Sequence, residues 1–452
     1  KLQDQPAGKV LMRISRHRTP AGLRRKVDSR QSITVRRGAM RIQIESVDTS
    51  LEDASGRLVR YRHTEWQKGG ERVVVEAGKA GDQMITIRGP EIARVAFEPK
   101  AHEPQLPYRH LFAAVMPRAG EVRRFRTYTS QTGGYTDNRL EVLAVDEQAG
   151  TIEARHTTKA LPGVTVRVVL DRQYMPVTME TGTGTLVFRF EQSGEEPAGQ
   201  QETEAPDLGP MLRIPVDAPL GDRDAIASAR YRIFGLPAHV EKDWLTGPGQ
   251  RVVEQPAAGV FVIESRRQPP PRRVNFPIPI KAPVLTPYLE TTATAQADDP
   301  GIRALAKKIT AGSGDMWTAA RRLRRWVTDE IENDMGMAFA AASEVLDKRK
   351  GDCSEQAVLL ATLARAAGIP ARCVVGLVYH DGAFARHMWT EVWAGDWRAL
   401  DAAMGTDLVG PAWLRIGDYS LRMTDDTRSG MGGLTAFVSD IAIEVLEVEP
   451  AP

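Results

Sequence analysis

The amino-acid sequence predicts an α+β protein, with antiparallel β domains in its N-terminal two thirds and a mixed domain of helices and strands after them. Three observations lead to this prediction. From residue 31 to about 192, short runs of β-branched residues alternate with polar ones. An acidic segment poor in large apolar residues interrupts the chain at 193–210. After Ala297, apolar residues recur every three or four positions, which is typical of amphipathic helices.

The first 30 residues are basic and weakly patterned, as in RISRHRTPAGLRRKVDSR. We expect residues 1–30 to form a basic N-terminal arm on the surface of the fold. A solvated arm is favoured over a contact with nucleic acid or lipid, because a local run of charge is weak evidence for a partner. Residues 31–192 contain runs such as RVVVEAG and GVTVRVVLD, and we expect a β-rich domain there.

The segment SGEEPAGQQETEAPDLGP, residues 193–210, has the composition of a flexible linker, so we place a domain boundary there. Strand-like runs resume with ARYRIFG and GVFVIES, and residues 211–294 are predicted to form a second, smaller β unit. This unit contains RRQPPPRR, whose consecutive prolines cannot donate to a sheet. No fixed-period repeat is found, so a solenoid or propeller is not expected.

Two amphipathic helices are predicted next, in DDPGIRALAKKIT and DMWTAARRLRRWVTDEIEN, each with an Asp as a candidate N-cap. Their apolar stripes comprise Ile302, Leu305 and Ile309 in the first helix, and Trp317, Ala320, Leu323, Val327 and Ile331 in the second. The RRLRRW run is interpreted as the solvated face of a core-packing helix rather than a phosphate site, because the apolar stripe is continuous.

Composition excludes some classes of protein. Lys and Arg number 60 against 58 Asp and Glu, so the global charge of a nucleic-acid-binding protein is missing. No run approaches the roughly 18 consecutive apolar residues that would span a bilayer. The start KLQDQPAGKV has neither an initiator Met nor a hydrophobic signal core, which would suit a processed chain. With only two cysteines, stability must come from packing, and both thiols are expected to be free.

The two cysteines occupy different environments in GDCSEQAVLLATLARAAGIPARC. Asp352 is a candidate N-cap, Gly368 a candidate helix end, and Cys353 would lie in the first turn of the helix between them. Free backbone amides and the positive end of the helix dipole favour a thiolate there, so Cys353 is placed to be reactive. Cys373 lies in the apolar run ARCVVGLVY, and we expect it to be buried and structural.

A nucleophilic thiol needs a base, and the base needs an orienting group. His387 opens the predicted strand HMWTEVW, and the next strand, WRALD, ends at Asp401. His380 lies in YHDG, most simply a turn, and the other six histidines lie far away in sequence. A Cys on a helix start, a His on a strand and an Asp on the adjacent strand have the arrangement of a Cys-His-Asp triad.

ASEVLDKRKGDCSEQAVLLATLARAAGIPARCVVGLVY and HMWTEVWAGDWRALDAAMG resemble the core of the transglutaminase-like superfamily, a papain-like α+β fold found in many bacterial proteins. The resemblance covers about 295–452 and implies a catalytic domain there, with Cys353, His387 and Asp401 as its triad. Many relatives with β domains ahead of this core are exported, so we expect a periplasmic or cell-envelope location. Animal transglutaminases bind calcium, but no acidic cluster with ligand spacing is present here, so neither a metal nor another cofactor is implied.

The hairpin between His387 and Asp401 tests the triad. With a two-residue turn at Gly395 and Asp396, Asp401 would lie opposite Thr390, on the wrong face for His387. A three-residue loop or a bulge shifts the register by one position and returns both side chains to one face. We therefore predict such an irregularity.

The chemistry implied is acyl transfer from an amide or peptide bond through a thioester on Cys353. The Cys353 amide is a candidate oxyanion donor, and the second donor is not identified. Hydrolysis by a cysteine peptidase or amidase, with a protein or peptide substrate, is the leading reading. Transglutaminase cross-linking is the first alternative, and a non-catalytic envelope scaffold is the second. Trp389, Trp393 and Trp397 could line a substrate groove or belong to the core.

Overall fold

The structure of the protein, a computed structural model, describes residues 7–451 except 20–21, 38–39, 55, 68–69, 103, 105–106, 113–115, 131, 184–185, 193–204, 208–212, 278–279, 281, 336–339, 408 and 423–439. The chain forms two compact units, Lys1–Leu208 and Gly209–Pro452. The division falls within the predicted linker 193–210, most of which lies outside the described residues.

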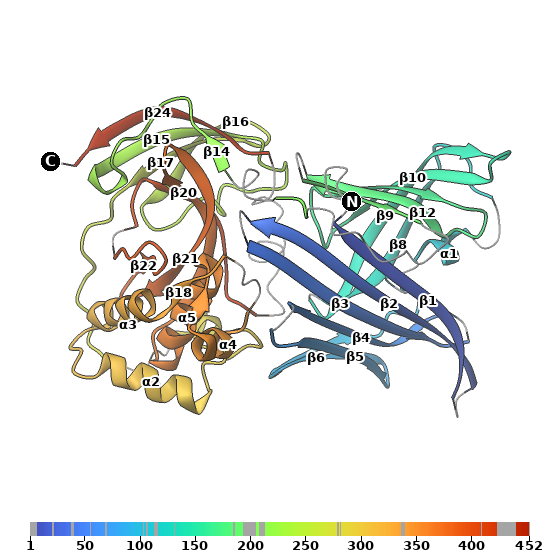
Figure 1. Ribbon diagram of the computed structural model, residues 1–452, viewed down its shortest axis with the longest axis horizontal. Helices are drawn as coiled ribbons and strands as arrows, with labels where there is room; N and C mark the ends of the chain where they lie inside the picture. Colours follow the sequence, from blue (N-terminus) through green and yellow to red (C-terminus); the bar gives the residue numbers. More distant parts are fainter. Residues whose placement is uncertain are drawn as a thin grey trace. The chain divides into compact units, whose positions relative to one another are not determined.

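The N-terminal unit contains two antiparallel sheets, each with its strands in sequence order (Figure 1). The seven-stranded sheet comprises β1 (Gly8–Thr19), β2 (Gly22–Arg37), β3 (Met40–Glu52), β4 (Leu58–Gln67), β5 (Val73–Ala80), β6 (Gln83–Arg88) and β7 (Glu91–Ala96). The six-stranded sheet comprises β8 (Val122–Thr129), β9 (Gly134–Asp146), β10 (Thr151–Thr158), β11 (Thr165–Leu170), β12 (Pro176–Thr183) and β13 (Leu186–Glu191), and a short helix, α1 (Tyr108–Leu111), packs on it. The predicted antiparallel β architecture is therefore confirmed.

The expected basic arm over residues 1–30 is wrong for residues 8–19 and 22–30, while residues 1–6 and 20–21 lie outside the described residues. Residues 8–19 and 22–37 form the long hairpin of β1 and β2, paired residue by residue from Gly8 opposite Ile33 to Thr19 opposite Gly22. The physical reason is that the apolar run VLMRI within the basic segment favours a strand, and the long stems of the arginines are compatible with extended backbone. The regular register leaves no free arm in this range.

The C-terminal unit is built around a five-stranded sheet. Its strands are β14 (Arg213–Pro215), β20 (Ala371–His380), β21 (Ala383–Trp393), β22 (Trp397–Leu400) and β23 (Trp413–Tyr419). The helices are α2 (Pro300–Thr310), α3 (Met316–Glu330), α4 (Ala342–Lys348) and α5 (Cys353–Ala366), and two short strands, β18 (Glu332–Asn333) and β19 (Lys350–Gly351), pair in parallel. Figure 1 shows the helices gathered on one side of the sheet.

A four-stranded sheet covers the other side. It contains β15 (Ile226–Phe234), β16 (Gln250–Ala257), β17 (Val260–Arg266) and, paired with β15, the C-terminal strand β24 (Ala442–Pro450). One apolar cluster lies between the two sheets, and a second joins the helices to the five-stranded sheet. The region 211–294 is therefore not a separate β unit. The apolar side chains of this region, such as Tyr231 and Phe261, are buried against strands of the five-stranded sheet.

The helices begin where the sequence analysis placed them. Asp299 caps the first helix by accepting a hydrogen bond from the backbone amide of Ile302. Asp315 caps the second in the same way, with the amide of Thr318 as donor. The RRLRRW face differs from the prediction at one position, because Arg324 is buried while Arg321 is exposed. No helix in the described ranges is both long and apolar enough to cross a bilayer.

Candidate active site

Cys353 is the first residue of α5 and is partly exposed. Asp352 caps the helix, since its Oδ1 accepts hydrogen bonds from the Ser354 amide at 2.8 Å and the Ser354 hydroxyl at 2.6 Å. A side-chain oxygen of Glu355 accepts the amide of Asp352 at 3.2 Å and so completes a capping box. These contacts fix the helix start and place the sulfur at its positive end, as the sequence predicts.

Two acidic side chains are buried beside the thiol. Asp352 is 3% exposed and Glu355 is 2% exposed. Burial, followed by the hydrogen bond and the charge of Asp352, raises the pKa of Glu355 to about 8. Glu355 is therefore protonated at neutral pH, which keeps a second negative charge away from the sulfur.

The hairpin of β21 and β22 brings His387 and Asp401 together. Trp393 pairs with Trp397 across a three-residue loop, and Thr390 pairs with Leu400, so the next residue, Asp401, follows on the face of His387. The predicted irregularity is confirmed, and of the two forms considered it is the three-residue loop. The His387 Nε2 and Asp401 Oδ2 atoms are 2.7 Å apart, and both residues are buried.

Asp401 accepts hydrogen bonds on both oxygens. Besides His387, Oδ2 accepts the indole N–H of Trp413 at 2.9 Å, and Oδ1 accepts the amide of Met404 at 3.0 Å. Burial alone would raise the pKa of Asp401, but the charge of His387 and these hydrogen bonds outweigh it and lower the pKa. Asp401 is therefore a carboxylate at neutral pH.

His387 also contacts Cys353. Burial lowers the pKa of the imidazole, but the charges of Asp401 and Cys353, and hydrogen bonds to both, raise it to about 10. Because Nε2 bonds to Asp401, Nδ1 is the ring nitrogen left for the sulfur. The structure thus places His387 so that it is hydrogen-bonded to Asp401 and interacts electrostatically with Cys353.

Side chains of α3 hold the loop that carries Asp401. Arg324 donates to Asp407 Oδ1 at 2.7 Å and to the carbonyl of Gly405 at 3.0 Å, while the Thr328 hydroxyl donates to the carbonyl of Ala402 at 2.8 Å. The backbones of Asp401 and Thr406 exchange two hydrogen bonds within the same loop. The loop is therefore tied to the helix layer and is closed on itself.

Trp389 supports the imidazole from the neighbouring position on the same strand face. Its ring stacks on His387 with a centroid distance of 6.4 Å and an interplanar angle of 24°. Gly376 lies directly opposite His387 on β20, and a methyl group there would come within 2.5 Å of Trp389. Trp389 is 2% exposed and belongs to the core between the sheets. The indole is thus a packing residue rather than an exposed groove wall.

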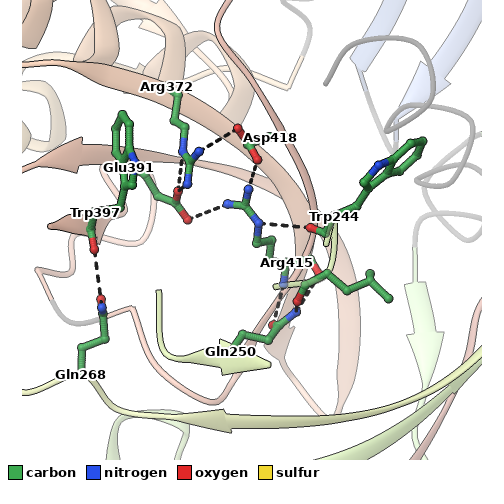
Figure 2. A network of polar contacts seen from close by, with 9 residues as sticks. Trp244, Gln250, Gln268, Arg372, Glu391, Trp397, Arg415 and Asp418 are labelled. Atoms are coloured by element: carbon green, nitrogen blue, oxygen red, sulfur yellow. Dashed lines mark hydrogen bonds and ion pairs between the residues drawn. The ribbon is translucent and has the colours of Figure 1, made fainter. Parts of the chain in front are cut away.

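A buried charge network lies farther along β21 (Figure 2). Arg415 Nη1 donates to Glu391 at 2.8 Å and also pairs with Asp418, while Arg372 bridges Glu391 and Asp418 at 2.7 and 3.0 Å. Burial would raise the pKa of Glu391, but the charges of Arg415 and Arg372 lower it on balance. Gln250 of β16 joins the network by accepting the Arg415 amide at 2.9 Å. Through Gln250 and Arg415 the network therefore links the two sheets, and Glu391 belongs to the same strand as His387.

The remaining candidates lie elsewhere. His380 ends β20 beside the turn residue Asp381 and is 53% exposed at its side chain. Cys373 is fully buried, and burial raises the pKa of its thiol to about 12, so the prediction of a structural thiol is confirmed. Within the described part of the chain, no group of three His, Cys, Asp or Glu side chains could hold a metal ion.

Sequence reasoning missed the supporting residues Trp413 and Arg324. Trp413 lies twelve residues after Asp401, and no spacing rule connects an indole to a carboxylate across a loop. Arg324 stands next to Leu323 in the helix stripe, so its position near the buried face was a usable signal.

Comparison with known protein families gives a match to the part of the chain that contains the candidate site. Residues 303–402, which include all three candidates, match the model of the transglutaminase-like superfamily. No curated protein matches the chain. Among solved structures, the chain is similar to a "Putative Cysteine Protease" from Cytophaga hutchinsonii, with 16% identity over 50% of this chain and 86% of that one and a TM-score of 0.31.

Two further solved structures are similar to the chain. A "putative protease" from Parabacteroides distasonis has 14% identity over 67% of this chain and 71% of that one, with a TM-score of 0.22. A "Beta-barrel-like Protein" of unknown function from Brucella abortus has 11% identity over 41% and 85%, with a TM-score of 0.30. The family match identifies a transglutaminase-like domain in the C-terminal third of the chain.

Proposed function

We propose that residues 295–452 form a papain-like catalytic domain that hydrolyses amide or peptide bonds with Cys353 as nucleophile. The observation that carries the proposal is that Asp401 holds His387 at 2.7 Å, while Cys353 stands at a capped helix start and interacts electrostatically with His387. The family match supports a cysteine-dependent enzyme. The proposal adds the role of each residue and the fate of the acyl group.

In the first half of the reaction, the Cys353 sulfur attacks the carbonyl carbon and the C=O electron pair moves onto oxygen. The backbone N–H of Cys353, at the start of α5, is one donor for that oxyanion. The tetrahedral adduct collapses, the C–N bond breaks, and the leaving amine takes a proton from Nδ1 of His387. The product is a thioester, with a neutral imidazole still bonded to Asp401.

In the second half, water attacks the thioester while His387 takes its proton, and the acid and the Cys353 thiolate are released. A substrate lysine could replace water, which would make the enzyme a transglutaminase. Both outcomes use the same residues, so the distinction rests on access to the thioester.

The test is to incubate the protein with a peptide library and a free primary amine, and to identify products by mass spectrometry. We expect cleaved or deamidated peptides from the native protein and from a Cys373→Ala control, which removes the buried thiol. We expect none from Cys353→Ala. Amine-linked products dependent on Cys353 would move the assignment to a transglutaminase. The absence of any Cys353-dependent product would refute catalysis and favour a scaffold.

Export to a bacterial cell envelope is part of the proposal and rests on resemblance alone. N-terminal sequencing and fractionation of the native protein test it. Recovery with the envelope or periplasmic fraction is expected, and recovery with the cytoplasm would contradict it.

A further inference from the structure

The basic hairpin at the beginning of the chain has no part in the proposed reaction. Residues 8–37 contain ten Lys and Arg against a single acid, Asp28, although the whole chain has a net charge of only +2. β1 is the edge strand of the seven-stranded sheet and is exposed along almost its whole length (dark blue in Figure 1). The charge is therefore concentrated on one exposed structural element.

The same strand exposes large apolar side chains. Val10 is 43% exposed, Leu11 54%, Met12 37% and Ile14 38%. Because side chains alternate across a strand, Val10, Met12 and Ile14 share one face and form a stripe about 13 Å long at ~3.3 Å per residue. Arg16 and Arg18 continue that stripe on the same face.

The cations of β1 remain available to a partner. Two on the neighbouring strand are neutralised, because Arg25 pairs with Glu52 at 3.2 Å and Lys26 with Asp28 at 2.8 Å. β1 itself contains no acidic residue. In the described ranges, no ion pair joins Arg16 or Arg18 to a carboxylate.

Protection of a free edge explains only part of this pattern. Charged residues on an edge strand prevent pairing with a second copy, and the arginines of β1 do this. An edge that served only to repel would not carry four exposed apolar side chains beside the charges. Nucleic acid would use the cations but not the apolar stripe. An anionic bilayer uses both, since its headgroups attract Arg and Lys while apolar side chains enter the interface.

We propose that β1, with the adjoining part of β2, is a docking surface for an anionic lipid bilayer. Val10, Met12 and Ile14 enter the interface, and Arg16 and Arg18 contact the phosphates. This surface places the protein on the membrane without spanning it. The inference is independent of the proposed catalysis and concerns the N-terminal unit alone.

Sedimentation with vesicles of phosphatidylcholine and phosphatidylglycerol in equal parts tests the proposal on the full chain. We expect binding to these vesicles, at least about tenfold weaker binding to pure phosphatidylcholine, and a loss of binding as salt rises. Arg16→Gln with Arg18→Gln should weaken binding at least about tenfold, and Val10→Ser with Met12→Ser and Ile14→Ser should do so even at low salt.

The matched control is Ile87→Ser with Ile92→Ser, which removes exposed apolar side chains of β6 and β7 in the same sheet, 46% and 50% exposed. We expect this control to bind as the native protein does, and all variants to keep the native melting temperature because the altered side chains are exposed. Equal binding to neutral and anionic vesicles would overturn the proposal. So would tighter binding to a short DNA duplex, or a control variant as weak as the β1 variants.

Discussion

Asp401 is held by more than its histidine. The indole N–H of Trp413 and the imidazole share one oxygen, and the amide of Met404 occupies the other. A carboxylate with three donors has a fixed orientation, and a buried one without them would lose its negative charge. Trp413 is therefore a positioning residue for the proposed triad.

Trp413→Phe removes one donor and keeps a ring in the core. We expect turnover on the proposed amide substrate to fall about tenfold, because a hydrogen bond to a charged group contributes roughly 1.5–3 kcal/mol. The low-pH limb of the activity profile should also move to higher pH, since Asp401 loses a contact that lowers its pKa. Trp317→Phe, at a partly buried indole that packs against the helix core, is the control. Similar losses and unchanged pH profiles in both variants would leave Trp413 with a packing role only.

Glu355 gives the fold a pH dependence with a definite sign. Its pKa is raised to about 8 in the folded protein, compared with about 4.3 in an unfolded chain. The folded state therefore holds a proton that the unfolded state releases between these values, so Glu355 makes the protein less stable as pH rises through this window.

Glu355→Gln should remove that loss. The free energy of unfolding of the variant, minus that of the native protein, should increase from pH 5 to pH 8, as measured by urea denaturation at each pH. Glu332→Gln, at an exposed position, should follow the native curve. A parallel pH dependence in native protein and Glu355→Gln would contradict the assignment of a protonated Glu355.

At the scale of the elements, the close approach of β20 to β23 and to Trp389 depends on Gly376. A Cβ at this position would lie 2.3 Å from the carbonyl oxygen of Leu414 and 2.5 Å from the Trp389 ring. Strands cannot move apart without breaking the ladder between β20 and β23, and the indole cannot move without disturbing His387.

Gly376→Ala should therefore lower both the melting temperature and the turnover. Gly382→Ala is the matched control from the turn of the same hairpin, where no atom lies within 4 Å of the added carbon. Gly382 has a φ of +78°, so its substitution also costs some stability, roughly 1 kcal/mol, but leaves the site intact. Full activity in Gly376→Ala would show that the contact of Trp389 with His387 is dispensable.

For the whole molecule, the local parts of the site could be predicted from sequence. The cap at Asp352 and the helix behind Cys353 follow from a few neighbouring residues, whereas the hairpin register was predicted from the requirement that His387 and Asp401 share a face. The place of β15, β16 and β17 in the C-terminal unit could not be predicted from sequence. It depends on the pairing of β15 with β24, which joins residues more than 200 positions apart. The first 30 residues were interpreted as an arm because of their positive charge. The apolar run VLMRI, which favours a strand, received too little weight.

The proposed reaction depends on a charged pair between Cys353 and His387, and the alkylation rate of Cys353 tests this pair most directly. Because the pKa of His387 is raised to about 10, the imidazolium persists through neutral pH and can stabilise a thiolate. Iodoacetamide at pH 6, followed by peptide mapping, should label Cys353 at least about tenfold faster in the native protein than in His387→Ala, with Cys373 unlabelled in both. Equal rates in the two proteins would contradict the proposed triad.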